Sequence, residues 1–152
     1  MRVFKFGGTS VGSAARMIEV AHLVQSQRDG QPLVIVASAM SGVTNLLVDA
    51  GAAVKAGDRT AAFDAVQALR AKHHAALNQL VPDGAQKAHG SVDALSEALW
   101  EILAASVHIG ELTPRVQDRV LATGEKLSVR LLAVAMGTIG IDAIPMDADT
   151  FL

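Results

Sequence analysis

The sequence predicts an α/β fold in which an open, mainly parallel sheet carries helices on both faces. Residues 2–6 form a short apolar run, residues 14–27 show apolar side chains at helical spacing, and residues 33–37 are an uninterrupted, β-branched apolar run. A run of the last kind is typical of a strand buried on both faces. A strand, a helix and a second strand joined by short links indicate a βαβ unit, whose strands are parallel.

Capping residues, breakers and periodicity predict the remaining elements. Ser13 is suited to cap the first helix. Further helices are predicted over residues 43–56, 60–80, 91–109 and 114–137, with Val81–Gly84 as the turn of a helical hairpin, and a third strand over Ile141–Pro145. Residues 146–152 are expected to leave the sheet. Three strands are few for so many helices, so we expect a truncated fold, the first part of a longer domain.

The composition excludes several functional classes. With 152 residues, of which 51% are hydrophobic and 18% charged, the chain is suited to one domain with a substantial core. A formal net charge of −2 and the absence of a basic stretch argue against a nucleic-acid partner. No apolar run reaches the length of a membrane span and no signal peptide is evident, so a cytoplasmic protein without a membrane partner is expected. The five histidines are scattered and predict no metal site.

The segment from Val3 to Ser10 is the most informative part of the chain. Gly7 and Gly8 follow the first strand and remove the Cβ atoms that would keep a backbone away from an anion. Lys5 adds a positive charge near the strand end, and a helix follows, which is an arrangement suited to phosphate. Two alternatives stay open: an ordinary Gly-Gly turn, and a lysine that protects an edge strand.

Two further segments are predicted to meet the first at the carboxyl ends of the strands, where ligands bind in open parallel sheets. Ser38 to Asn45 is crowded with small residues and hydroxyls, which suit either a ligand site or a turn and helix cap. Glu125 lies at the edge of an apolar helix stripe, from which it could point to the sheet. Its alternative is a solvated pairing with Lys126 or Arg130.

Three motifs together resemble the signatures of the aspartokinases, in the amino acid kinase superfamily. They are Lys5–Val11, Ser38–Asn45 and Ala122–Ser128, in that family's order. The Met-Arg-Val start is also similar to bifunctional aspartokinase–homoserine dehydrogenases. The resemblance implies transfer of the γ-phosphoryl of ATP to the side-chain carboxylate of L-aspartate, the first step of lysine, threonine and methionine biosynthesis. It implies ATP with Mg²⁺ carried on the nucleotide.

The resemblance also implies roles for individual residues. Lys5 would be the catalytic lysine that neutralises the transferring phosphoryl group, and the phosphate loop would be formed by Phe6, Gly7, Gly8 and Ser10. Thr44 would bind the carboxylate end of the amino acid and Glu125 its α-ammonium group, with Ser38 and Asn45 as further candidates nearby.

The resemblance extends over the whole chain but leaves out the parts of the family that follow it. The nucleotide-binding half and the regulatory domains are absent from residues 1–152, so the chain is expected to be the N-terminal, amino-acid-binding part and to be inactive alone. A homo-oligomer is expected, and Trp100 is expected to pack against a neighbouring helix or a partner subunit. Alternatives are a kinase of glutamate, acetylglutamate, a carbamate or a nucleoside monophosphate, and a non-catalytic ligand-binding module.

Overall fold

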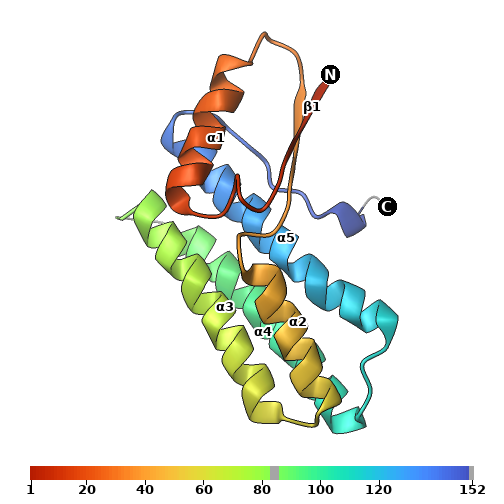
Figure 1. The fold of residues 1–152 in the computed structure, drawn as a ribbon. Helices are drawn as coiled ribbons and strands as arrows, with labels where there is room; N and C mark the ends of the chain where they lie inside the picture. Colours follow the sequence, from red (N-terminus) through yellow and green to blue (C-terminus); the bar gives the residue numbers. More distant parts are fainter. Residues whose placement is uncertain (83–85, 151–152) are drawn as a thin grey trace.

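The computed structural model describes residues 1–82 and 86–150, and it has the expected α/β class. Strands β1 (Arg2–Phe6) and β2 (Leu33–Ala37) pair in parallel, from Arg2 opposite Leu33 to Phe6 opposite Ala37. Helix α1 (Ala14–Ser26) connects them (Figure 1). The βαβ unit predicted from the sequence is therefore confirmed.

Four long helices follow the second strand: α2 (Val43–Lys55), α3 (Arg59–Leu80), α4 (Gln86–Ile109) and α5 (Pro114–Thr138). Helix α4 begins five residues before its expected start at residue 91. The sequence Gln-Lys-Ala at its first positions favours a helix, and Gly90 is tolerated there because no other group lies within 4 Å of where its Cβ would be. The hairpin turn expected at 81–84 falls partly on residues 83 and 84, which lie outside the described residues.

Side chains cap three of the helices at their first turn. Ser13 accepts a hydrogen bond from the backbone of Arg16 at the start of α1, as its position in the sequence predicts. Asp58 caps α3 and Thr113 caps α5 in the same way. Helix α2 differs, because its N-cap residue is Gly42, at φ 79°, and no side chain caps it. The first turn of α2 therefore keeps backbone N–H groups available to a ligand.

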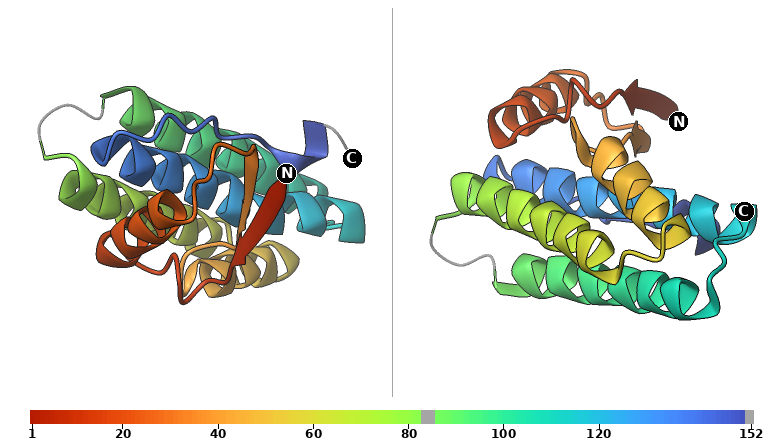
Figure 2. Two further views of the ribbon diagram at one scale, coloured as in Figure 1. Left: turned by 90° about the horizontal axis from the view of Figure 1, so that it is seen from above. Right: turned by 60° about the horizontal axis from the view of Figure 1, so that its bottom comes forward.

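Helix α5 is the centre of the molecule and contacts α1, α2, α3, α4 and β2. The strands and α1 lie on one side of the helical bundle, and α4 lies on the far side (Figure 2, right). The core is built from aliphatic side chains on these elements, and Leu103, Leu127 and Leu131 are completely buried. None of the described helices combines the length and the apolarity needed to cross a bilayer.

Within the described residues, helices cover only one face of the strand pair. Phe6, Leu33 and Ile35 pack against the core on that face. Val34 and Val36 point the other way and are 44% and 46% exposed. The expectation that β2 is buried on both faces is therefore wrong for this chain. An uninterrupted apolar run indicates a strand that can be covered on both faces, but it does not determine whether the helices of the described residues supply both layers.

The third strand expected at 141–145 does not form within the described residues. The segment starts with the buried Ile141, which donates to the carbonyl of Met136, and runs back along α5 to a short 3₁₀ helix, Ala148–Thr150. Figure 1 shows this segment as a coil beside α5. Ion pairs hold it in place instead of a β ladder: Arg130 binds both carboxylate oxygens of Asp147, at 2.7 and 3.0 Å, and Lys126 binds Asp149 at 2.6 Å. Residues 151 and 152, the end of the expected exit from the sheet, lie outside the described residues.

The Arg130–Asp147 pair makes the stability of this segment dependent on pH. The hydrogen bond from Arg130 is the main cause that lowers the pKa of Asp147 in the folded chain. A group with a lowered pKa stabilises the fold above its unfolded pKa of about 3.9, and that contribution is lost as pH falls through the folded pKa. We expect Asp147→Asn to lower the free energy of unfolding by about 1 kcal/mol at pH 7 and to have little effect near pH 2. Urea unfolding at both pH values measures this.

Asp142→Asn is the matched control, since Asp142 is exposed on the same segment and forms no ion pair within the described residues. It should leave the free energy of unfolding unchanged at both pH values. An Asp147→Asn variant whose loss is the same at pH 7 and pH 2 contradicts the assignment.

Candidate functional site

The loop after β1 folds back on the carbonyl of Gly7. The backbone N–H groups of Ser10 and Val11 donate to this oxygen at 2.9 and 3.3 Å. Val11 is completely buried and anchors the loop in the core. No other group lies within 4 Å of the position a Cβ would take on Gly7, so the loop is open on that side. Open backbone of this kind can approach an anion closely.

The loop after β2 lies directly against the first loop. The N–H of Ser38 donates to the carbonyl of Phe6 at 3.0 Å, and the Ser41 hydroxyl donates to the carbonyl of Gly8 at 3.1 Å. A Cβ on Gly8 would lie 2.9 Å from the carbonyl oxygen of Ala39, and one on Gly12 would lie 2.6 Å from the Ser41 hydroxyl. The two loops therefore touch because these positions are glycine.

Helix α5 packs against the second of these loops. Gly124 is packed so tightly that a Cβ there would lie 2.8 Å from the Cβ of Ala39. The next residue, Glu125, is exposed, and one of its carboxylate oxygens accepts a hydrogen bond from the N–H of Ala39 at 3.4 Å. The expected meeting of the glutamate with the strand ends is thus present in the structure.

The alternative for Glu125, a pairing with Lys126 or Arg130, is not what the structure shows. Both cations bind the aspartates of the segment that follows α5. The second carboxylate oxygen of Glu125 has no hydrogen bond or ion pair within the described residues. Glu125 therefore offers a negative charge beside the loops.

The start of α2 adds polar groups to the same edge of the sheet. Thr44 and Asn45 are exposed in its first turn, and Ser38 is half-buried before it. None of the three caps the helix, and Ser41 is used to bind the other loop. The helix-cap part of the alternative is therefore wrong, whereas the turn is present, since the N–H of Val43 donates to the carbonyl of Met40 at 3.0 Å. The positive end of the α2 dipole remains available.

Lys5 makes fewer contacts than the other predicted site residues. It is exposed, and it lies on the uncovered face of the sheet beside Val36 of β2. Within the described residues it forms no hydrogen bond or ion pair. Phe6 is on the covered face, packed against the core, and Ser10 is half-buried in the loop. Gly7 and Gly8 lie between Phe6 and Ser10, at the end of β1. Lys5 is thus close to the glycine turn in sequence, but no contact in the chain fixes its ammonium group.

Sequence reasoning missed several features of this site. The N–H of Ala39 and the hydroxyl of Ser41 connect the three segments. Ser41 was among the hydroxyls expected at this edge, but its bond to the first loop was not expected, and Ala39 did not stand out by type. Gly12 is needed for the loop contact, and its position after a Gly-Gly turn was a signal that could have been used. Asp147 was expected only to lie in a segment that leaves the sheet. It forms an ion pair with Arg130, a cation that could otherwise pair with Glu125.

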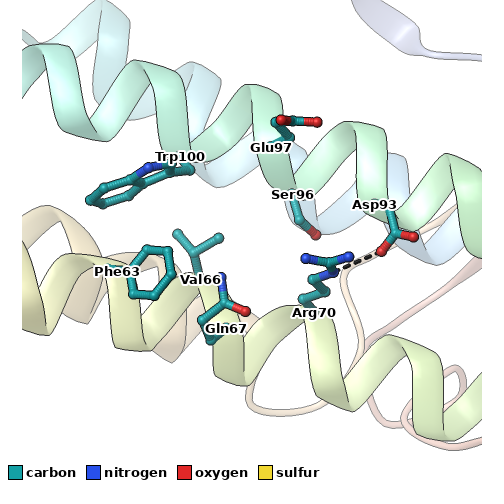
Figure 3. A pocket seen from close by; sticks show the side chains of 8 residues that line it. All are labelled: Phe63, Val66, Gln67, Arg70, Asp93, Ser96, Glu97 and Trp100. Carbon is teal, nitrogen blue, oxygen red and sulfur yellow. Dashed lines mark hydrogen bonds and ion pairs between the residues drawn. The ribbon is translucent and has the colours of Figure 1, made fainter.

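A cavity lies away from these loops, between α3 and α4 (Figure 3). It measures about 420 Å³ and runs from the aromatic pair Phe63 and Trp100 to the ion pair of Arg70 with Asp93. Trp100 meets Phe63 edge to face at 5.0 Å, and Arg59 lies over its ring. The expectation that Trp100 packs against a neighbouring helix is confirmed. A smaller cavity of about 170 Å³, beside Phe6 and Ser10, adjoins the glycine loop.

Comparison with known proteins agrees with this geometry. The model of the amino acid kinase family matches residues 1–152. The chain belongs to the amino acid kinase family. Among relatives in that family, aspartokinase 1 of Arabidopsis thaliana chloroplasts is 36% identical over 148 residues, which are 96% of this chain and 25% of that protein. The aspartate kinase of Pseudomonas fluorescens is 31% identical over 93% of this chain and 22% of that protein.

Solved structures in this family also resemble the chain. The E. coli aspartokinase III complex with lysine and aspartate has a TM-score of 0.77 and 27% identity, covering 93% of this chain and 30% of that one. The complex of the same enzyme with aspartate and ADP has a TM-score of 0.77 and 28% identity, covering 95% and 30%. The chain spans about a quarter of the length of the relatives it matches. The likeness confirms the amino acid kinase fold expected from the three motifs.

Gly124 gives a direct test of the close approach between α5 and the second loop. Besides Ala39, a Cβ there would lie 3.2 Å from side-chain atoms of both Val43 and Leu47. Because these neighbours belong to the core, Gly124→Ala should lower the free energy of unfolding by about 1–3 kcal/mol. Urea unfolding measures the change.

Gly137→Ala, on the same helix, is the matched control. No other group lies within 4 Å of the position its Cβ would take, so the alanine should leave stability unchanged or raise it by up to about 1 kcal/mol. If both variants are equally stable, the contact of α5 with the loop is looser than the structure shows.

Proposed function

We propose that this chain is the amino-acid-binding part, with the phosphate loop, of an aspartate kinase. One observation supports this above all: the three motif segments converge at one edge of the sheet. The Ser41 hydroxyl joins the first two at the carbonyl of Gly8, and the N–H of Ala39 joins the second to Glu125. The family and the aspartokinase relatives that cover the chain support the same reaction.

The proposed amino-acid site combines a negative and a positive side. Glu125 has a free carboxylate oxygen, which suits the α-ammonium group of aspartate. Thr44, at the uncapped start of α2, offers a hydroxyl and a helix N-terminus to a carboxylate. Asn45 and Ser38 lie on either side and can add hydrogen bonds. An amino acid bound between these groups would present its side-chain carboxylate to the glycine loop.

The proposed phosphate site is the loop of Gly7, Gly8 and Ser10, with Phe6 fixing the strand end from the covered face. A carboxylate that attacks a phosphoryl group brings two anions together, so catalysis needs positive charge and N–H donors where they meet. Lys5 would supply the charge once a nucleotide occupies the uncovered side. The nucleotide would bring Mg²⁺ on its phosphates, since this ion prefers phosphate oxygens and water to an all-protein cage.

The remaining parts of the reaction are proposed to lie outside these residues. The relatives are about four times as long as this chain, and the structure matched with ADP is also longer. We infer that residues 1–152 bind the amino acid and the transferred phosphoryl group, and that the adenine and ribose are bound by other sequence. This arrangement would let the chain bind aspartate without transferring phosphate by itself.

The amino-acid site is tested by calorimetric titration of the 152-residue chain with L-aspartate. Glu125→Gln removes the charge that faces the ammonium group but keeps an acceptor for the N–H of Ala39, so the dissociation constant should rise at least tenfold. Glu111→Gln is the control, because Glu111 is exposed in the loop before α5. That variant should bind aspartate as the parent chain does.

The same titration with L-glutamate separates the other functions. Tighter binding of glutamate would assign another acceptor within the family. An unchanged affinity in Glu125→Gln would contradict the proposed site. If a correctly folded chain binds neither amino acid, the aspartate kinase assignment gives way to a module with another ligand.

Lys5 is tested separately by its effect on nucleotide affinity. Lys5→Met keeps the length of the side chain and removes its charge, so the affinity for Mg-ATP should fall about tenfold, and the affinity of the parent chain should weaken as salt is added. Lys55→Met is the control, because Lys55 lies at the far end of α2, where it binds Gln117. Equal affinities of the two variants would show that the ammonium group of Lys5 does not reach the phosphates.

A further inference from the structure

The cavity between α3 and α4 has an apolar end and a charged end. Val66, Phe63 and Trp100 form the apolar end, and Arg70 and Asp93 form the charged one (Figure 3). Its volume of about 420 Å³ is within the range of small-molecule sites, which combine an apolar wall with a few polar groups. None of its lining residues belongs to the glycine loop, to the second loop or to the start of α2.

The apolar end leaves aromatic surface in contact with solvent. The Phe63 ring meets the Trp100 ring edge to face at 5.0 Å, and Arg59 lies 5.0 Å from the centre of the Trp100 ring. These contacts hold the tryptophan, but Phe63 remains 40% exposed. The buried Val66 lines the cavity next to it. An apolar group that enters the cavity would remove the Phe63 ring from water, which favours binding.

The charged end has hydrogen-bond donors that the described part of the chain does not use. The Nε–H of Arg70 donates to Oδ1 of Asp93 at 2.7 Å. The two terminal nitrogens of Arg70 form no hydrogen bond or ion pair within the described residues. A guanidinium group binds a carboxylate best through two parallel N–H groups, so Arg70 can still bind a carboxylate in this way. Figure 3 shows the guanidinium group between Val66 and Asp93.

Unused acceptors lie on α4 at the same end of the cavity. Oδ1 of Asp93 is shared by Arg70 and Nε2 of His74, whereas its Oδ2 has no hydrogen bond among the described residues. Glu97, one turn further along α4, is exposed and also has no hydrogen bond or ion pair there. This end therefore offers one cation and two anions. The carboxylates would repel a simple anion, and Arg70 would repel a simple cation, so a molecule that carries both charges fits best.

We propose that this cavity binds a free α-amino acid with an apolar side chain. Such a molecule carries its two opposite charges at one end and its apolar group at the other, as the cavity does. The terminal nitrogens of Arg70 bind its carboxylate. Glu97 and Oδ2 of Asp93 accept from its ammonium group. Its side chain packs against Phe63 and Trp100.

This site is separate from the one proposed for aspartate and does not depend on the kinase function. The aspartate site lies where Glu125 meets the second loop, and no residue of that edge lines the cavity. In the cavity, the side-chain carboxylate of aspartate would lie against Phe63 and Trp100 and lose its hydration without an ion-pair partner. The cavity therefore selects against aspartate.

The fluorescence of Trp100 reports on the cavity directly, because it is the only tryptophan of the chain. Titration of the 152-residue chain with L-phenylalanine should give a saturable change in tryptophan emission, with a dissociation constant of about 1 mM or lower. Two analogues test the charged end: 3-phenylpropionate lacks the ammonium group, and 2-phenylethylamine lacks the carboxylate. Each should bind about tenfold more weakly than L-phenylalanine.

Two variants test the residues that bind the charged groups. Arg70→Lys keeps the charge but loses the paired N–H groups, so the dissociation constant of L-phenylalanine should rise about tenfold. Glu97→Gln should raise it about threefold, because an exposed ion pair contributes less. Glu101→Gln is the matched control: Glu101 is exposed on α4 and does not line the cavity, so this variant should bind as the parent chain does.

Four results would overturn the proposal. The first is a dissociation constant for L-phenylalanine above about 1 mM. The second is equally tight binding of 3-phenylpropionate or 2-phenylethylamine, which would mean that only one charge is recognised. The third is unchanged affinity in Arg70→Lys or Glu97→Gln. The fourth is displacement of L-phenylalanine by L-aspartate, which would place the binding at the loops instead of the cavity.

Discussion

The contact between the two loops at the carboxyl ends of β1 and β2 is the constraint on which the rest of the site depends. It needs bare backbone at Gly8 and Gly12, because a side chain at either position would meet the second loop. It also needs a residue without a side chain at Gly124, so that α5 can pack against Ala39. Once these approaches are made, each polar group of the site is held by core packing behind it, for example by the buried Val11 and Leu127. A preorganised edge of this kind suits binding of charged groups.

The location of charge follows from the same constraint. The uncapped start of α2 makes the loop side positive, and Glu125 makes one point negative. Arg130 and Lys126 lie on the same helix as Glu125 and would weaken that negative point if they were free to turn toward it. Asp147 and Asp149 hold them instead. The segment after α5 thus contributes to the electrostatics of the site without touching it.

The sequence was sufficient to predict what depends on local pattern. The βαβ unit followed from strand and helix periodicity. The cap at Ser13 and the position of the glycine loop followed from residue type. The sequence was not sufficient where contact with another element determines the structure. The run at 33–37 is equally apolar whether one face or two are covered. Residues 141–145 look like a short strand, although ion pairs of the following aspartates, not a β ladder, hold the segment. The meeting of Arg70 with Asp93 depends on the pairing of two helices, which neither helix encodes alone.

The position of Lys5 allows two interpretations of the uncovered sheet face. It is exposed on the sheet face that helices leave uncovered, next to two exposed valines of β2. A lysine on a bare, apolar strand face could serve to prevent edge-to-edge association, and that interpretation needs no ligand. The phosphate role instead requires that an anion approach from the uncovered side. The open backbone at Gly7 and the uncapped start of α2 are at the same sheet edge, and protection against association explains neither. The phosphate role accounts for all three features, and for this reason it is the stronger interpretation.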